Sequence, residues 1–517
     1  MAERDSSSDD CLRGYQLEML DASLRGNSIV VMPTGSGKTL VAVGRIRAEL
    51  ERSAPTKLVW FLANSVELSR QQLGVLRTHL PAYQILSLTG QDGVDNWSRQ
   101  HIWDAVLANV RVVVGTPAVL KDALTHGFVR ISRLALLIFD EAHHCIKNHP
   151  TNAIMKNFYH PAKIRAEDMP SVLGLTASPV FNPKEGGMNE LELNMDATVV
   201  TPTRTLEELM RFVYPVPLTL LTHPASTLSE YPGSSSLCWA LKYAAAKYDF
   251  SADPEQIRTL NRKATTLYDQ LGIQSAEFYV RNCKERFEAG AIRDLVLPDT
   301  TMSEQQHLLS ILQALSGPTP SLMRQEELLT PKAECLITLL AQQTSSFISE
   351  GKAIVFAKER ATVVGLTHVL RASPRLKVLY SVGAFVGTST FAGRASVADL
   401  AEPRQQARDL VDFRNGTKNL MVATSVLEEG IDVRECNLVV NFDAPNTLIG
   451  YIQRRGRARM QDSKYYILAL EHDPQINASK WQGQEARMKQ EYMNAFRERV
   501  EADNLRRRWE CSLQTLP

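Results

Sequence analysis

The 517-residue sequence lacks the features of several protein classes. It contains no apolar run approaching the ~18 residues that a membrane helix needs, and its first ten residues, MAERDSSSDD, are acidic and polar, unlike a secretory signal. Neither charge sign dominates, since 58 Lys and Arg face 57 Asp and Glu. A polyanionic partner would therefore have to meet local basic clusters. We expect a cytoplasmic protein without a membrane partner; the nucleus stays open as a location.

The sequence is also poor in cysteine and has no CxxC pair. The seven cysteines are scattered, at positions 11, 145, 238, 283, 335, 436 and 511. An odd, dispersed set predicts reduced thiols in an intracellular compartment. The length predicts about three domains.

A glycine-rich stretch, "MPTGSGKT", follows the β-branched run that starts at Ser28. Strand, loop and helix in this order form a phosphate cradle, because backbone amides and a helix N-terminus favour negative charge. Lys38 would reach the β and γ phosphates of ATP and Thr39 would bind Mg²⁺. Met32 stands where the longer GxxxxGK[ST] pattern has its first glycine. The nucleotide-binding candidates here are Met32, Pro33, Thr34, Gly35, Ser36, Gly37, Lys38 and Thr39.

A buried strand over 134–139 ends in Asp140 and Glu141. Ligands gather where parallel strands end, so Asp140 is expected to bind Mg²⁺ and Glu141 to orient or deprotonate the attacking water. Upstream of the loop, Gln16 would read the adenine edge and Arg13 would stack on its ring.

Four arginines crowd into "QRRGRAR" in the second half of the sequence. Such a run is by default a solvated basic patch or a nucleic-acid contact. Because Gln453 precedes it and a glycine interrupts it, we favour arginine fingers aimed at the γ-phosphate, with Arg457 and Arg459 as candidates. Gly430 and Asp432 are expected to meet the ribose side.

Polar residues at four further strand ends are candidates for sugar and phosphate contacts that do not read sequence. They are Asn64, Thr116, Thr424 and Ser425. Taken singly, each could equally cap a helix.

Strand-like runs alternate with helical stretches at 27–200 and again at 350–470, which predicts two tandem RecA-like α/β domains with doubly wound parallel sheets. Between them only helical periodicity is visible, as in Ile257, Leu260, Ala264 and Leu267. The expected organisation is an irregular N-terminus (1–10), an ATP-binding domain (11–205), a second domain (206–233 and 322–470), an all-helical insertion (234–321) and a C-terminal helical brace (471–517).

These motifs resemble superfamily 2 RNA helicases: "TGSGKT", "DEAH", "TAS", "VATSVLEEGID" and "QRRGRAR". "FLANSVELSRQQ", "DEAHHCIKNHPTNAIMKNFY" and "CNLVVNFDAPNTLIGYIQRRGRAR" are more narrowly similar to the helicase region of fungal Dicer-like proteins. The resemblance spans roughly residues 11–510.

The resemblance implies an ATP-driven protein that engages double-stranded RNA in RNA silencing or antiviral defence, as a monomer. Because no ribonuclease III half follows, we expect that the chain alone does not cut RNA. Two other hypotheses stay open: a non-catalytic RNA-binding or regulatory module, and a DNA helicase of the repair type. RNA-stimulated ATP hydrolysis would distinguish the ATP-driven RNA protein from both alternatives, since A-form shape and the 2′-hydroxyl distinguish RNA from DNA.

Overall fold

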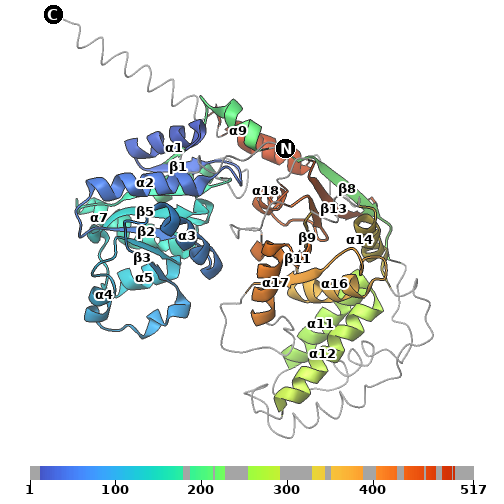
Figure 1. The fold of residues 1–517 in the computed structure, drawn as a ribbon. Coiled ribbons are helices and arrows are strands. Elements are labelled where there is room, and N and C mark those ends of the chain that lie inside the picture. The colour runs from blue at the N-terminus through green and yellow to red at the C-terminus, as the bar shows by residue number, and fades with distance from the viewer. Residues whose placement is uncertain are drawn as a thin grey trace, which may run out of the picture.

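The computed structural model describes residues 12–178, 187–213, 216–226, 254–291, 329–343, 351–387, 403–427, 436–458, 462–472, 480–491 and 493–494. Figure 1 shows two lobes, each built on a sheet, with a pair of long helices extending from the second lobe. Two parallel α/β domains confirm the predicted fold class.

The first lobe contains a seven-stranded parallel sheet in the order β3-β4-β2-β5-β6-β1-β7. Its strands are β1 (Ser28–Val31), β2 (Leu58–Leu62), β3 (Ile85–Leu88), β4 (Val112–Gly115), β5 (Leu134–Asp140), β6 (Ser171–Thr176) and β7 (Thr198–Val200). Its helices are α1 (Gly14–Arg25), α2 (Lys38–Arg52), α3 (Val66–His79), α4 (Gln100–Val106), α5 (Pro117–Thr125), α6 (Pro150–Ile154), α7 (His160–Ile164), α8 (Gly187–Met195) and α9 (Leu206–Phe212).

Helices cover both faces of this sheet because its central strands carry apolar residues on both faces. In β1, Val30 points into a core shared with α1, α2 and α3, whereas Ile29 and Val31 join the core under α5 and α6. Alternate residues of a strand face opposite sides, so a continuous apolar run requires cover on both. The predicted strands at 28–32 and 134–139 match β1 and β5 to within one residue.

The second lobe contains a six-stranded parallel sheet in the order β10-β11-β9-β12-β13-β8. Its strands are β8 (Leu218–His223), β9 (Ala353–Phe356), β10 (Val382–Phe385), β11 (Leu420–Ala423), β12 (Leu438–Asn441) and β13 (Lys464–Leu470). Its helices are α14 (Pro331–Ala341), α16 (Arg360–Ala372), α17 (Pro403–Asn415) and α18 (Leu448–Arg455).

Two helices, α11 (Pro254–Leu271) and α12 (Ile273–Ala291), fall within the region where the sequence predicts a helical insertion. They share one core with α14, α16 and the sheet of the second lobe. The packing on α16 is close: a Cβ at Gly365 would lie 2.7 Å from Leu267, and the rings of Phe278 and His368 stack at 3.7 Å. Ala264 and Leu267 are buried, as the predicted stripe requires, while the side chains of Ile257 and Leu260 lie outside the described residues.

The segment that joins the lobes departs from the predicted organisation. The sequence analysis assigns residues 206–233 to the second domain, but α9 packs on α1, and Leu209 is buried in the core of the first lobe. Only β8 joins the second sheet. The described contacts thus divide the lobes after α9 rather than at residue 205.

The predicted C-terminal brace is described as helix over residues 480–491. It lies against α18: the rings of Trp481 and Tyr451 stack at 5.7 Å, and Met488 is buried with the residues of that helix. The rest of the helix predicted to end at Trp509 lies outside the described residues. No helix in the described part of the chain is long and apolar enough to cross a membrane.

Candidate nucleotide site between the lobes

The loop between β1 and α2 adopts a conformation that requires glycine at two positions. Gly35 and Gly37 have φ of 86° and 80°, in the left-handed region that L side chains rarely adopt. A Cβ on Gly37 would also overlap the amide nitrogen of Gln16. Lys38, the first residue of α2, donates from Nζ to the carbonyl oxygens of Met32 at 3.1 Å and Pro33 at 3.4 Å. A phosphate would offer this ammonium group a charged acceptor in place of two neutral ones.

Gln16 connects α1 to this loop. Its Oε1 accepts a hydrogen bond from the Arg13 backbone N–H at 2.9 Å, and its Nε2 donates to the Ser36 carbonyl oxygen at 3.0 Å. The side chain is 3% exposed. Gln16 therefore holds the helix and the loop in a fixed relation, and its predicted contact with adenine stays a prediction.

The acidic pair lies at the end of β5, where the sequence places it. Asp140 accepts hydrogen bonds from Gln72 Nε2 at 3.0 Å and from the Glu141 N–H at 3.1 Å. Glu141 is a non-glycine residue with a φ of 49°. Such backbone costs about 1–3 kcal/mol and clusters at functional sites. His143 Nδ1 lies 3.3 Å from Glu141 Oε2 and 3.0 Å from Thr176 Oγ1, which connects the pair to the end of β6.

The two carboxyl groups have opposite pKa shifts. Burial raises the pKa of Asp140 above its usual value, and the charge of Glu141 raises it further. Burial acts in the same direction on Glu141, but the hydrogen bond and charge of His143 outweigh it and lower the Glu141 pKa. Two neighbouring carboxyls do not ionise equally without a cation. Glu141 is thus the carboxyl group of the two that ionises more readily.

The donor set fits a magnesium ion held together with substrate phosphates. Within the described residues, no group of three or more His, Cys, Asp or Glu is arranged to hold a metal by itself. Mg²⁺ is usually bound through one or two carboxylates and phosphate oxygens. Asp140 and the Thr39 hydroxyl supply the oxygen ligands that this chemistry requires, and the raised Asp140 pKa marks a carboxylate that a cation would stabilise.

The four predicted nucleic-acid contacts follow β2, β4 and β11, whose carboxyl ends lie on the same edges of their sheets as the predicted site residues. Asn64 Nδ2 donates to the Asp140 carbonyl oxygen at 3.5 Å, which places it beside the acidic pair. Thr116 is the residue before α5, and its side chain makes no cap hydrogen bond. Thr424 Oγ1 donates to the Val386 carbonyl at 3.4 Å, whereas Ser425 is exposed. Their predicted contacts with RNA stay predictions.

The last two residues of α18, Arg454 and Arg455, have different surroundings. Arg454 is 4% exposed; its Nη1 donates to Asn441 Oδ1 at 3.0 Å and to the Asp443 carbonyl at 2.9 Å. Arg455 forms an ion pair with Glu485 of the brace. Both interactions lie within the second lobe and its brace. They are consistent with the prediction that neither Arg454 nor Arg455 is the arginine finger.

Gly456 brings this region against the phosphate loop. A Cβ at this position would lie 2.9 Å from Thr34 Cβ, so the close approach requires glycine. Gln453 and Arg457, flanking it, are 4% and 3% exposed. Arg459, Gly430 and Asp432, which the sequence assigns to the γ-phosphate and ribose, lie outside the described residues.

A cavity of about 340 Å³ lies at this contact. Its walls come from the phosphate loop, from α9, from α18 and from the brace. They include Thr34, Gly35, Phe212, Val213, Gly456 and Met488. The brace reaches the first lobe here, since Ser178 Oγ donates to Met488 Sδ at 2.9 Å. Sequence reasoning missed Gln72, Phe212 and Glu485 at this site, because no motif contains them.

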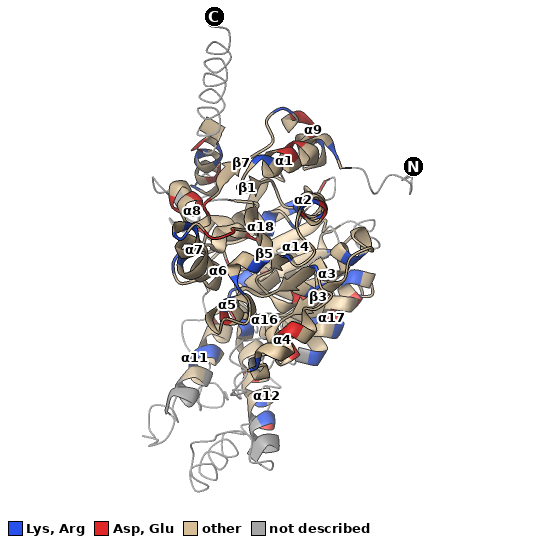
Figure 2. Cartoon of the chain, turned by 90° about the vertical axis from the view of Figure 1, so that its left-hand side faces the viewer, with Lys and Arg blue, Asp and Glu red and all other residues tan. Residues whose placement is uncertain are grey.

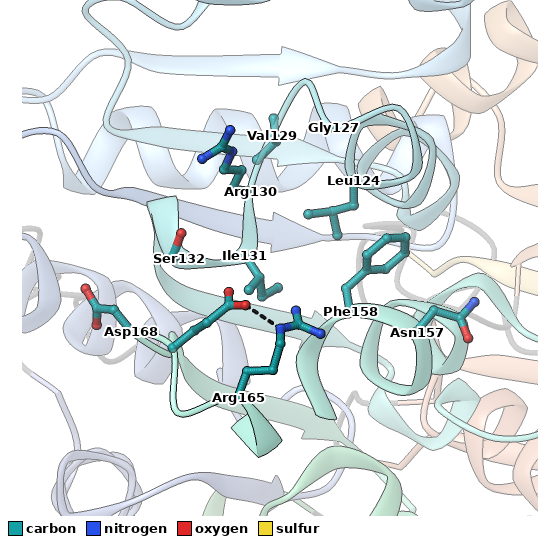
Figure 3. Close-up of a pocket in the computed structure, with 11 residues that line it drawn as sticks. Leu124, Gly127, Val129, Arg130, Ile131, Ser132, Asn157, Phe158, Arg165 and Asp168 are labelled. Carbon is teal, nitrogen blue, oxygen red and sulfur yellow. Dashed lines mark hydrogen bonds and ion pairs between the residues drawn. The ribbon is translucent and has the colours of Figure 1, made fainter. Parts of the chain in front are cut away.

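A larger cavity, of about 590 Å³, lies elsewhere on the first lobe (Figure 3). Residues before β5, including Arg130 and Ser132, form one wall, and Arg165 pairs with Glu167 at 2.7 Å on another. These residues precede the strands whose far ends carry Asp140 and Thr176. The larger cavity is therefore remote from the nucleotide candidates.

Charge adds little to the definition of the site. Lys and Arg are interspersed with Asp and Glu along the helices that face the viewer in Figure 2.

Comparisons with known proteins agree with this geometry. The DEAD/DEAH box helicase family matches residues 13–185, and the helicase conserved C-terminal domain matches residues 331–461. The chain is 38% identical to Dicer-like protein 2 of Phaeosphaeria nodorum, covering 94% of this chain and 37% of that protein. Dicer-like protein 2 of Pyricularia oryzae is 39% identical, with 94% and 34% covered. That of Emericella nidulans is 40% identical, with 91% and 33% covered.

The chain thus spans between a third and two fifths of the length of these curated relatives. Among solved structures, the helicase domain of Pyrococcus furiosus Hef has the same fold, with a TM-score of 0.50 at 23% identity over 91% of this chain and 98% of that one. With both helicase domains matched in chain order and Dicer-like relatives aligned along nearly the whole sequence, the chain belongs to the superfamily 2 helicases of the Dicer-like type.

Proposed function

We propose that this chain is an ATPase stimulated by double-stranded RNA, and that it translocates along the duplex or clamps it. One observation carries the proposal: Thr34 of the phosphate loop meets Gly456 of the second lobe. A nucleotide held by that loop would therefore have protein on both sides. Its binding and hydrolysis would then change how the lobes fit together.

The residues of the first lobe divide the chemistry among them. Lys38 would bind the β and γ phosphates, and Thr39 and Asp140 would hold Mg²⁺. The ion, when bound, neutralises charge that develops on the phosphates. Glu141 would orient or deprotonate the attacking water; its lowered pKa keeps it ionised and able to accept a hydrogen bond from that water.

The second lobe would supply the arginine finger. The sequence motif makes Arg457 and Arg459 the candidates: Arg457 follows Gly456, which meets Thr34 of the phosphate loop, and Arg459 lies outside the described residues. An arginine in this role contributes about 10³–10⁵ in rate.

Duplex RNA is the proposed activator, and RNA silencing or antiviral defence the proposed setting. Support comes from the Dicer-like relatives and from the polar strand ends at Asn64, Thr116 and the exposed Ser425. Hydroxyl and amide groups there suit the sugar–phosphate backbone rather than base edges.

The deciding experiment measures steady-state ATP hydrolysis without nucleic acid, with blunt duplex RNA and with duplex DNA of the same sequence. We expect the RNA duplex to raise kcat and the DNA duplex to do so weakly. RNA affinity should fall steeply with salt, since phosphate contacts dominate. No turnover with any nucleic acid would instead favour a binding module, and equal stimulation by DNA would favour a repair helicase. A denaturing gel of the same reactions tests the prediction that residues 1–517 leave the RNA uncut.

A further inference from the structure

Helix α9 precedes the connection to the second lobe. The residues just before its N-terminus are hydrogen-bonded to α1. Glu18 of α1 accepts five hydrogen bonds: from the N–H and hydroxyl groups of Thr203 and Thr205, at 2.6–3.2 Å, and from the Arg204 N–H at 3.1 Å. Burial opposes ionisation of Glu18, but these hydrogen bonds outweigh it and lower its pKa. The carboxylate thus fixes where α9 begins relative to the start of α1.

At its C-terminal end, α9 places the ring of Phe212 against Arg13, the residue predicted to stack on adenine. The Arg13 guanidinium carbon lies 3.7 Å from the centroid of the Phe212 ring. Arg13 Nη1 donates to the Tyr15 hydroxyl at 3.1 Å, and the rings of Tyr15 and Phe212 are 6.3 Å apart. Arg13 is exposed and Phe212 is 48% exposed. One face of the guanidinium group is therefore covered by Phe212, and the group remains accessible.

Two further observations place Phe212 near the phosphate loop. It lines the cavity that also borders Thr34, Gly35 and Gly456. Gln16 binds both the Arg13 N–H and the Ser36 carbonyl, so the position of Arg13 is tied to the phosphate loop. A base bound next to that loop would come within reach of the Arg13–Phe212 pair.

We propose that Phe212 is a positioning residue for the nucleotide base: it holds the Arg13 guanidinium flat so that the opposite face stacks on adenine. This inference rests on the proposed nucleotide site and adds a residue from the connection between the lobes. A guanidinium group already ordered by a ring loses less conformational freedom when the base binds.

The test uses the full 517-residue chain and titrates ADP and, separately, pyrophosphate by calorimetry. Phe212→Leu keeps an apolar side chain but removes the π face, and Phe212→Tyr keeps the π face. Leu17→Ala, on α1 and equally exposed, is the matched control. We expect Phe212→Leu to weaken ADP binding about two- to fivefold, the value of an exposed cation–π contact. Phe212→Tyr and Leu17→Ala should bind ADP like the unaltered chain.

Pyrophosphate separates the base from the phosphates. All variants should bind it equally, because it has no ring to stack on Arg13. Unchanged ADP affinity in Phe212→Leu, or an equal loss for pyrophosphate, would overturn the positioning role. An unaltered chain that binds ADP but never hydrolyses ATP would overturn the proposed motor while the ADP affinities still judge Phe212.

Discussion

The two lobes hold their cationic residues against different partners. In the first lobe, Lys38 Nζ donates to two neutral carbonyls of its own loop, Met32 and Pro33, in a half-buried position. In the second, Arg454 is almost fully buried, and its Nη1 bonds to Asn441 and to the Asp443 carbonyl, with the guanidinium carbon 5.0 Å from the Phe356 centroid. An arriving phosphate can replace the partners of Lys38, whereas Arg454 would have to leave the interior of its lobe.

This difference distinguishes a charged residue that can bind a ligand, Lys38, from one that stabilises the fold, Arg454. A hydrogen bond to a charged group contributes more when the acceptor is also charged, so Lys38 gains by exchanging carbonyls for phosphate. A guanidinium group that satisfies buried acceptors gains nothing from exposure and leaves those acceptors unpaired. Substitutions of Lys38 and Arg454 should therefore affect different quantities: turnover for Lys38 and stability for Arg454.

The largest effect is expected from Lys38→Ala, which should reduce RNA-stimulated ATP hydrolysis to background. The side chain supplies charge to the phosphates, and the fold should stay intact because the acceptors of Lys38 Nζ are carbonyl oxygens of its own loop. Steady-state turnover measures the loss, and thermal unfolding checks the fold. Lys121→Ala, an exposed lysine on α5, should behave like the unaltered chain. Turnover that survives in Lys38→Ala would refute the site assignment.

Next in size is Arg457→Ala, which should lower kcat about 10³-fold if Arg457 is the finger. ADP binding should change little, since the finger acts on charge that develops during transfer. Single-turnover kinetics with saturating ATP and RNA measure the chemical step directly. A normal rate would exclude Arg457 as the finger and would leave Arg459 as the candidate.

Arg454→Ala should act on stability instead. Removing the guanidinium group leaves Asn441 Oδ1 and the Asp443 carbonyl without this donor inside the lobe, at a cost of about 2–3 kcal/mol. For a lobe of this size that corresponds to about 5–10 °C in melting temperature. Calorimetry on Arg454→Ala and Arg457→Ala sharpens the contrast: a large loss of kcat in Arg454→Ala without a shift in melting would show that we have assigned the two residues the wrong way round.

The sequence predicts the two lobes well because their signals are local. Buried parallel strands are apolar along most of their length, as in Leu134–Asp140, and a glycine loop with Lys38 follows the apolar strand Ser28–Val31. Asp140 and Glu141 end a strand, so the chain order alone brings them to the loop.

What the sequence does not predict depends on contacts between distant segments. Gln72 lies on α3 and reaches Asp140 across 68 residues. Phe212 meets Arg13 through the packing of α9 on α1, a contact that also moves α9 out of the predicted second domain. Arg454 and Arg455 are neighbours in one motif but have different partners, because Asn441 and Glu485 come from other elements.

The smallest effect concerns a carboxylate of the first lobe that is structural rather than catalytic. Glu18 is held by hydrogen bonds from residues 203–205, which lower its pKa from 4.5. A lowered pKa means that its stabilising contribution is present above pH 4.5 and is lost as the pH falls through the folded value. Between pH 6 and pH 3 the unaltered chain should therefore lose more melting temperature than Glu18→Gln, which has no charge to titrate. Parallel losses in both chains would show that Glu18 does not hold α9 through its charge, and that the first lobe, like the second, depends on other groups for this packing.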